Sequence, residues 1–138
     1  MSATYYFLPS RNVFGEGSVA QAGELLKSLN VSKPLIVTDA FLAKSGMAER
    51  LVKILETSGM SSAIFGGAEP NPTDKNVEAG VKAYLADGCD SIISLGGGSS
   101  HDCAKAIGLV VSNGGKISDY EGVDKSSNPM VPLLAINT

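Results

Sequence analysis

The chain has 138 residues and a net charge of −3, with 43% hydrophobic and 18% charged residues. This length suits one domain with a substantial core, and the composition is typical of a soluble globular protein. The net negative charge and the scattered basic residues give no electrostatic reason to expect binding to nucleic acid or to an anionic membrane surface. No apolar run approaches the roughly 20 residues of a membrane-spanning helix, and the N-terminus lacks a secretory pattern, so we expect a cytoplasmic location.

The first predicted elements are aromatic-rich runs at residues 5–8 and 12–15, which flank Pro9-Ser10 and predict a β-hairpin. Ser18 and Gln21 have capping-box spacing and predict a helix that buries a stripe of Val19, Ala22, Leu26 and Leu29. Residues 35–38 then form a short apolar run after a proline, which predicts a strand that ends at Asp39.

The middle of the chain repeats this alternation of helix and strand. We predict a helix from about residue 47 to 58, stopped by Gly59, that carries Met47, Leu51, Ile54 and Leu55 on one face. A strand at 63–65 follows. A loop with two prolines follows at 69–73. Thr73 can cap the next helix, which we expect to end at Gly88 and to bury Val77, Val81, Tyr84 and Leu85.

The last elements are a strand at 91–95, a glycine turn, a helix that ends at 113–115, and a strand at 131–136. The helix places Ala104, Ile107, Val110 and Val111 on one side. Strands that are apolar without alternation are buried on both faces, as in a parallel sheet covered by helices. We therefore predict an α/β fold with a Rossmann-like, doubly wound parallel sheet and an N-terminal β-hairpin.

Residues 1–138 are predicted to form one dinucleotide-binding domain. Asn137 and Thr138 stand at the tip of an apparently central strand, where a functional loop begins in such folds. We therefore expect the domain to continue past this point in a longer protein. The alternative is a natural small domain with an edge strand there.

The glycine turn at residues 96–99 is the strongest functional signal. Gly96, Gly97 and Gly98 let a ligand approach the backbone closely, and the helix start behind them offers unpaired amides to a phosphate. Ser99 can cap the helix and also donate its hydroxyl to a phosphate oxygen, and Asp102 three residues later completes a Ser-x-x-Asp capping pair. The alternative is that these glycines merely form a tight connection.

The turn differs from the usual dinucleotide fingerprint, because His101 stands at the third glycine position and the acidic residue Asp39 precedes the glycines. Neighbouring parallel strands end in one crevice, so the two elements can still meet. Asp39 can accept both ribose hydroxyls of an adenosine and disfavour NADP, or it can cap a turn at 40–44. The pattern leaves both interpretations open.

Several other polar residues carry weaker signals. We expect His101 to be a residue of the helix start near a cofactor rather than a catalyst or ligand. Lys105 can add positive charge near a phosphate, pair with Asp102, or be an ordinary solvated lysine. Asn71 lies between two prolines and is a ligand contact or part of a turn. The two cysteines, at 89 and 103, share no close-spaced motif and predict small, half-buried residues in a reducing compartment.

Residues 96–105, Gly-Gly-Gly-Ser-x-x-Asp-x-x-Lys, resemble the signature of the iron-containing (type III) alcohol dehydrogenases. Segments 36–39, 69–73, 119–122 and 132–138 are also similar to that family, in the same order, so the resemblance runs nearly end to end. It is closest to the bacterial NAD-dependent primary alcohol, methanol and 1,3-propanediol dehydrogenases.

The resemblance implies an NAD-binding domain followed by an all-helical domain, absent from these 138 residues, in which one aspartate and three histidines bind Fe²⁺ or another divalent metal. The metal would polarise the oxygen of a small alcohol or aldehyde, and the nicotinamide would exchange hydride with the carbon. The full-length parent would be a homo-oligomer. The 138 residues alone are expected to be inactive, and the resemblance gives no catalytic residue among them.

The resemblance also assigns cofactor-binding roles residue by residue. The glycine turn and Ser99 would hold the pyrophosphate, Asp39 would bind the adenosine ribose, and Asn71 would lie near the nicotinamide. Asp102 and Lys105 would tune cofactor placement, and Thr138 would begin a threonine-rich loop over the cofactor.

Two other functions stay open from the residues alone. One is a complete, non-catalytic nucleotide-binding domain, since the sequence contains no recognisable set of metal ligands and no nucleophile with catalytic partners. The other is an ATP-dependent kinase domain, which also places glycines after a parallel strand. Such kinases need an acidic residue within the turn for Mg²⁺, and Gly98 occupies that place.

Overall fold

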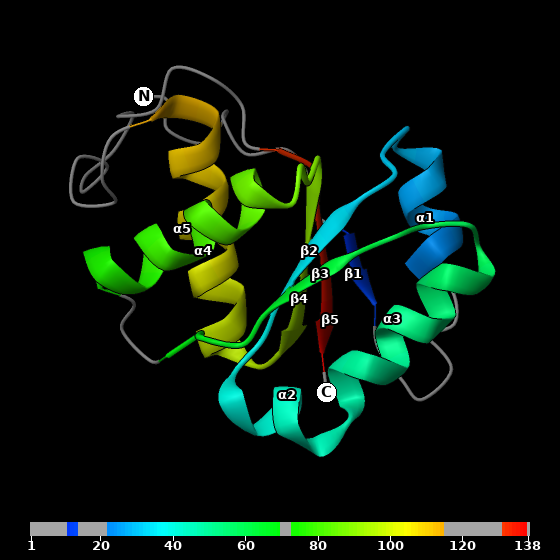
Figure 1. The fold of residues 1–138 in the computed structure, drawn as a ribbon, viewed down its shortest axis with the longest axis horizontal. Coiled ribbons are helices and arrows are strands. Elements are labelled where there is room, and N and C mark those ends of the chain that lie inside the picture. Colours follow the sequence, from blue (N-terminus) through cyan, green and yellow to red (C-terminus); the bar gives the residue numbers. More distant parts are fainter. Residues whose placement is uncertain (1–10, 14–21, 70–72, 115–130, 138) are drawn as a thin grey trace.

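The computed structural model describes residues 11–13, 22–69, 73–114 and 131–137. Within them, five strands form one parallel sheet in the order β1-β5-β4-β2-β3 (Figure 1). The strands are β1 (Arg11–Val13), β2 (Pro34–Val37), β3 (Ala63–Phe65), β4 (Ser91–Gly96) and β5 (Leu133–Asn137). This arrangement confirms the predicted doubly wound α/β fold.

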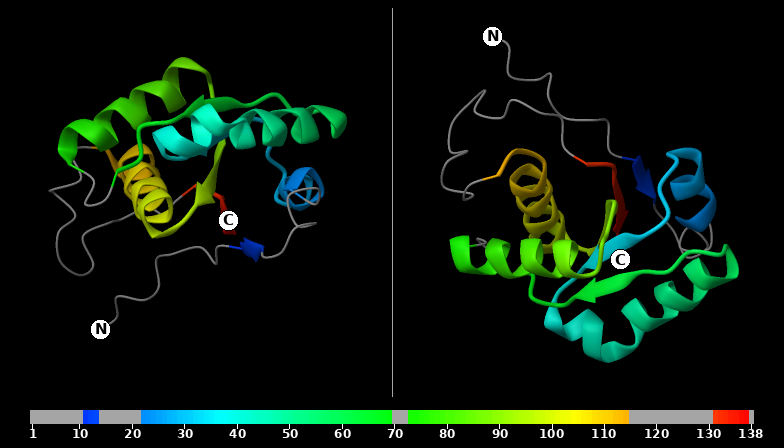
Figure 2. Two further views of the ribbon diagram at one scale, coloured as in Figure 1. Left: turned by 90° about the horizontal axis from the view of Figure 1, so that it is seen from below. Right: turned by 45° about the horizontal axis from the view of Figure 1, so that its top comes forward.

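Helices cover both faces of the sheet (Figure 2). The helices are α1 (Ala22–Ser28), α2 (Ala40–Ser45), α3 (Met47–Thr57), α4 (Asp74–Ala86) and α5 (Gly98–Asn113). Helices α1 and α3 pack together on one face, while α4 and α5 pack together on the other. Helix α2 follows β2 directly and lies at the carboxyl edge of the sheet, near the end of β5 (Figure 1).

The core consists of two apolar layers separated by the sheet. Alternate strand residues point to opposite faces. Leu35, Val37 and Ile92 therefore join the layer under α4 and α5, whereas Ile36 and Ile93 join the layer under α1 and α3. Every residue of β2 and β4 is buried, as the unbroken apolar runs predicted.

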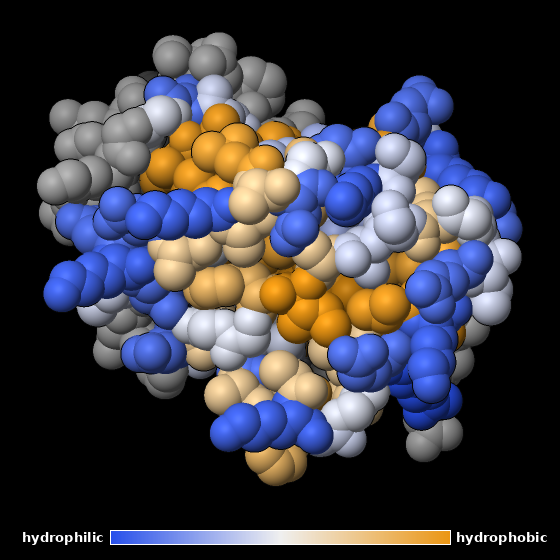
Figure 3. Space-filling view, in the orientation of Figure 1, coloured by the Kyte–Doolittle hydropathy of each residue, from blue (hydrophilic) through white to orange (hydrophobic). Residues whose placement is uncertain are grey.

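Strand β3 is the edge strand beside β2, and all three of its residues are half-buried. Figure 3 shows apolar surface across the middle of the molecule, where this strand lies. Among the described residues, no helix has the length and apolar content needed to cross a membrane.

The helix ends follow the expected local chemistry. The Thr73 side chain accepts a hydrogen bond from the Asn76 amide and caps α4, as predicted. Helix α3 ends next to Gly59, whose φ of +80° is a left-handed conformation that glycine adopts without strain. These boundaries confirm the predicted second and third helices to within two residues.

The prediction that Leu85 is buried was wrong, because its side chain is 65% exposed. Val77, Val81 and Tyr84 lie on the buried face of α4, and one further residue rotates Leu85 about 100° toward solvent.

The N-terminal hairpin prediction is tested only in part. Its first strand, at 5–8, lies outside the described residues, as does the predicted cap at Ser18 and Gln21. The described part, Arg11–Val13, pairs in parallel with β5 at the edge of the sheet.

Candidate functional site

The candidate site lies at the carboxyl edge of the sheet, between β2 and β4. From β2 the chain moves outward to β3, then returns to the other side of β2 to form β4 and β5. The loops after β2 and β4 therefore diverge and leave a crevice, which is where open α/β sheets bind ligands. Asp39 follows β2, and the glycine turn at residues 96–98 follows β4.

The glycine turn exposes the N-terminus of α5. Gly97 is the N-cap and Gly98 is the first helical residue, so the amides at positions 98–100 precede the first intrahelical bond, from His101 N to Gly97 O at 3.1 Å. Gly97 and Gly98 are exposed, and a Cβ on either would meet no described atom within 4 Å. Open space therefore lies beside unpaired donors at the positive end of the helix dipole, which suits a phosphate group.

Gly96 has a different role from the two glycines that follow it. Its φ is +134°, and a Cβ there would lie 2.8 Å from Ser100 Oγ and 3.1 Å from Leu42 Cδ1. Gly96 thus allows α2 and the start of α5 to approach each other closely. A side chain at this position would separate the two sides of the crevice.

The prediction that Ser99 caps α5 was wrong. The N-cap is Gly97, which makes no side-chain hydrogen bond, and Ser99 is the second residue inside the helix. The glycines start the helix earlier than the Ser-x-x-Asp pattern predicted, so Ser99 and Asp102 do not form a capping pair. Ser99 is half-buried and Asp102 is exposed.

Asp39 caps α2, which confirms one of the two interpretations of this residue. Its Oδ1 accepts a hydrogen bond from the Leu42 amide at 2.8 Å, and its backbone is extended. The carboxylate is half-buried beside the crevice. A cap made by one carboxylate oxygen is compatible with a second role for the other.

Thr38 connects the loops of the site and was not among the predicted site residues. Its side chain is fully buried, and its Oγ1 donates to the Leu95 carbonyl at 2.9 Å. Its own amide donates to Phe65 O, and its carbonyl accepts from the Ala68 amide. The available signal was a hydroxyl-bearing residue between an apolar strand and an acidic residue.

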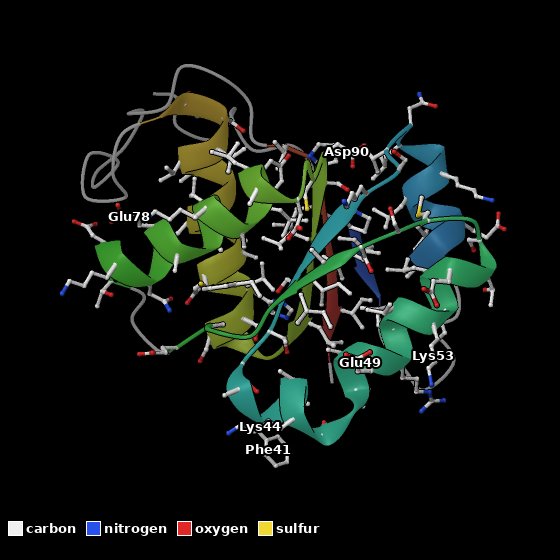
Figure 4. All side chains as sticks on the ribbon, in the orientation of Figure 1. Phe41, Lys44, Glu49, Lys53, Glu78 and Asp90 are labelled. Carbon is white, nitrogen blue, oxygen red and sulfur yellow. The ribbon has the colours of Figure 1, made fainter. Side chains whose placement is uncertain are left out.

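The exposed side of α2 lies next to the candidate site at the carboxyl edge of the sheet. Phe41 is 76% exposed, and both Phe41 and Lys44 point away from the sheet at its carboxyl edge (Figure 4). This orientation follows from the Asp39 cap, because the cap fixes where the first turn of α2 begins.

His101 lies in the first turn of α5, where it was expected. Its Nδ1 is hydrogen-bonded to the hydroxyl of Ser94, a fully buried residue of β4. This bond ties the start of α5 to the sheet beneath it.

Cys103 and Asn76 link α5 to α4. Cys103 Sγ donates to Asn76 Oδ1 at 3.2 Å, and Asn76 Nδ2 donates to the Gly67 carbonyl. Burial, with a smaller effect of Glu69, raises the pKa of the Cys103 thiol to about 11. Burial, followed by the charge of Asp87, raises the pKa of the half-buried Cys89 to about 11. Both thiols are therefore protonated at neutral pH and are poor nucleophiles.

Of the remaining predicted site residues, the structure describes only Lys105. Lys105 is exposed on α5, one turn after His101. Asn71, Thr138 and the segment 119–122 lie outside the described residues. In the described parts of the chain, no group of three or more His, Cys, Asp or Glu side chains is placed to hold a metal.

Two described features of this edge are of the kinds found in nucleotide sites. Gly97 and Gly98 border open space at a helix N-terminus, and Asp39 offers a carboxylate at the neighbouring strand end. These are the two kinds of group that hold a diphosphate and a ribose in α/β nucleotide sites.

Comparison with known proteins finds similar sequences among dehydrogenases. The NAD-dependent methanol dehydrogenase of Bacillus methanolicus is 47% identical over 135 residues, which cover 98% of this chain and 35% of that protein. The 1,3-propanediol dehydrogenase of Klebsiella pneumoniae is 38% identical over 135 residues, which cover 96% of this chain and 35% of that protein. The chain thus spans about a third of the length of these relatives.

Solved structures share the fold over almost the whole chain. A 1,3-propanediol oxidoreductase matches with a TM-score of 0.87 and 39% identity, covering 96% of this chain and 35% of that one. A sulfoacetaldehyde reductase from Bifidobacterium kashiwanohense, in complex with NAD+, matches with a TM-score of 0.80 and 27% identity, covering 94% of this chain and 34% of that one. Residues 9–138 match the family described as iron-containing alcohol dehydrogenase, and the chain belongs to this family.

Proposed function

We propose that this chain is the NAD-binding part of an oxidoreductase that transfers hydride between a primary alcohol, or its aldehyde, and NAD. The observation that carries the proposal is the open glycine turn at the start of α5, which lies across the sheet crevice from Asp39. Such a crevice binds a diphosphate at a helix N-terminus and a ribose at an acidic strand end. NAD appears in the name or title of two similar proteins.

The residues have distinct roles in this proposal. The amides beside Gly97 and Gly98 hold the pyrophosphate, and the hydroxyl of Ser99 adds a donor, since it is not used as the helix cap. Asp39 binds the adenosine ribose with the carboxylate that also caps α2. Gly96 contributes its conformation rather than a direct contact.

Four further residues are proposed from family resemblance. Asn71 lies near the nicotinamide, and Thr138 begins a loop over the cofactor. Asp102 and Lys105 are exposed on α5, where they adjust the local charge around the phosphates. We further propose a homo-oligomeric, cytoplasmic full-length protein.

A divalent metal, with iron as the family's namesake, is proposed to be held by residues of a helical domain beyond these 138. When bound, such a metal supplies a Lewis acid for the alcohol oxygen. The described residues are proposed to bind and orient the dinucleotide, and no candidate metal cluster occurs among them.

Titration of the protein with NADH, followed by nicotinamide fluorescence, tests the proposal. Gly97→Val should abolish binding, because a branched side chain would fill the space beside the amides, while thermal unfolding stays cooperative. Unchanged NADH affinity in this variant would remove the phosphate role. Parallel titration with Mg-ATP tests the kinase alternative, since binding of ATP without NADH would overturn the dehydrogenase assignment.

Activity is tested in the full-length protein. NAD-dependent oxidation of a short primary alcohol should be lost after treatment with a chelator and restored by Fe²⁺ or another divalent metal. NADH binding without any metal-dependent turnover would instead support a non-catalytic nucleotide-binding domain.

A further inference from the structure

We propose that Ser100 is a further residue of the nucleotide site, whose hydroxyl hydrogen-bonds to the diphosphate of the bound dinucleotide. This inference rests on the proposed function and adds a donor that is separate from the backbone amides.

The side chain of Ser100 is buried without a partner. The residue has 0% exposed surface, and its Oγ has no hydrogen-bond partner among the described residues. Nearly all buried side-chain polar atoms in proteins are paired, and a serine in the first turn of a helix commonly bonds to nearby backbone. The Ser100 hydroxyl is therefore available to a partner from outside the described residues.

The hydroxyl lies within the candidate site. Ser100 is the third residue of α5, and its Oγ is 2.8 Å from the position that a Cβ would occupy on Gly96. Leu42 Cδ1, from α2, lies 3.1 Å from the same position. Ser100 Oγ thus lies beside Gly96, where the glycine turn meets α2.

A phosphate oxygen is the partner that this position favours. The amides at 98–100 and the dipole of α5 already favour an anion at the same end of the helix. A hydroxyl that donates to a charged oxygen forms a stronger bond than a hydroxyl that donates to a neutral acceptor. Because Ser100 Oγ is buried, the proposal requires a neighbouring side chain to move, and Leu42, half-buried beside Gly96, is the candidate.

Ser62 provides a matched control. Its Oγ is also buried without a partner among the described residues, but it immediately precedes β3. Because the strands are parallel, Ser62 lies at the amino edge of the sheet, opposite the glycine turn. Ser62→Ala therefore makes the same chemical change away from the nucleotide.

The experiment compares wild type, Ser100→Ala and Ser62→Ala by titration with NADH and with ADP-ribose, and by thermal unfolding without ligand. Ser100→Ala should weaken both ligands by about 10-fold or more, because both contain the diphosphate. Its unfolding midpoint without ligand should equal or exceed that of wild type, since the variant loses only an unpaired hydroxyl. Ser62→Ala should bind both ligands like wild type.

Wild-type affinity of Ser100→Ala for NADH would overturn the inference, and so would weakening confined to NADH, which would place the contact at the nicotinamide. A lower unfolding midpoint in Ser100→Ala would also overturn it, because the hydroxyl would then have a partner in the free protein. Failure of wild type to bind NADH would instead refute the proposed function itself.

Discussion

The Thr38 hydroxyl donates a hydrogen bond to the carbonyl of Leu95 at 2.9 Å, and this bond joins the two strand ends that form the candidate site. Thr38 immediately precedes Asp39, and Leu95 immediately precedes the glycine turn. The bond therefore adds to the pairing of β2 with β4 in fixing the spacing between the proposed ribose and phosphate positions. Because Thr38 is fully buried, the bond is shielded from competing water.

Thr38→Val should lower both stability and cofactor affinity. Valine retains the shape of threonine but removes the donor, which should cost about 1–3 kcal/mol of unfolding free energy when the bond is buried. We also expect weaker NADH binding, because the two sides of the crevice lose their direct link. Urea unfolding and NADH titration measure the two effects.

Thr57→Val is the control for this prediction. Thr57 Oγ1 also donates to a backbone carbonyl, that of Ile54, but on the exposed surface of α3. The substitution should change stability by less than about 0.5 kcal/mol and leave NADH affinity unchanged. Equal effects of the two valine variants would contradict the proposed role of Thr38.

The general location of the site was predictable from the sequence, because strands and helices alternate and parallel strands end at one edge. Asp39 and the glycine turn are each identified by a strand that ends immediately before them. Thr38 was not predictable in this way, since its importance comes from a contact with Leu95, 57 residues away. Long-range hydrogen bonds leave no periodic pattern in the sequence.

Substitution of Asp39 should separate its capping role from its proposed ribose role. Asparagine is as good an N-cap as aspartate, so Asp39→Asn should keep stability within about 0.5 kcal/mol of wild type. Removal of the charge should nevertheless reduce the preference for NADH over NADPH, because a carboxylate repels the 2′-phosphate. Competitive titration of both cofactors measures this preference.

Asp39→Gly extends the same test. Glycine is a tolerated N-cap, so the loss of stability should be only a few tenths of a kcal/mol. The added space should relax discrimination against NADPH at least as much as asparagine does. An unchanged ratio of NADH to NADPH affinity in both variants would refute the ribose role and leave Asp39 as a cap alone.

The glycines of the turn should respond differently to alanine. Gly96→Ala should cost more than about 1 kcal/mol of unfolding free energy, because φ is +134° and the new Cβ would crowd Ser100 and Leu42. Gly98→Ala should leave stability unchanged or higher, since its Cβ would meet open space, but it should weaken NADH binding. Urea unfolding with NADH titration distinguishes structural from ligand-contacting glycines. If Gly98→Ala destabilised the protein as much as Gly96→Ala, this division of roles would be wrong.

The start of α5 shows why the sequence pattern was insufficient here. Ser99 and Asp102 have the spacing of a capping pair, but the helix begins at Gly98. Gly97 is the N-cap, with an extended backbone and no side-chain hydrogen bond. A propensity pattern predicts which residue is the best cap. It does not include the preceding strand, which ends at Gly96 and fixes where the turn begins.

Asp90 ties together the amino ends of β2 and β4, as Thr38 ties their carboxyl ends; Figure 4 shows it at the opposite end of the sheet from Phe41 and Lys44. Its carboxylate accepts from the amides of Ser32 and Lys33, each at 2.9 Å, and from the hydroxyl of Ser91 at 3.0 Å. Burial acts to raise the pKa of Asp90, but these hydrogen bonds outweigh it and hold the pKa below the ordinary value of 3.8.

The lowered pKa of Asp90 predicts a pH-dependent contribution to stability. The native state favours the ionised carboxylate, so the contribution is fully present above the ordinary pKa and is lost as pH falls through 3.8 toward the lower native value. The unfolding free energy of Asp90→Asn should therefore lie furthest below that of wild type near neutral pH, and the difference should shrink below about pH 4. Urea unfolding at a series of pH values measures it, with Asp87→Asn, an exposed neighbour, as the control. A difference that stayed constant down to about pH 2 would show that asparagine acts through packing rather than through loss of charge.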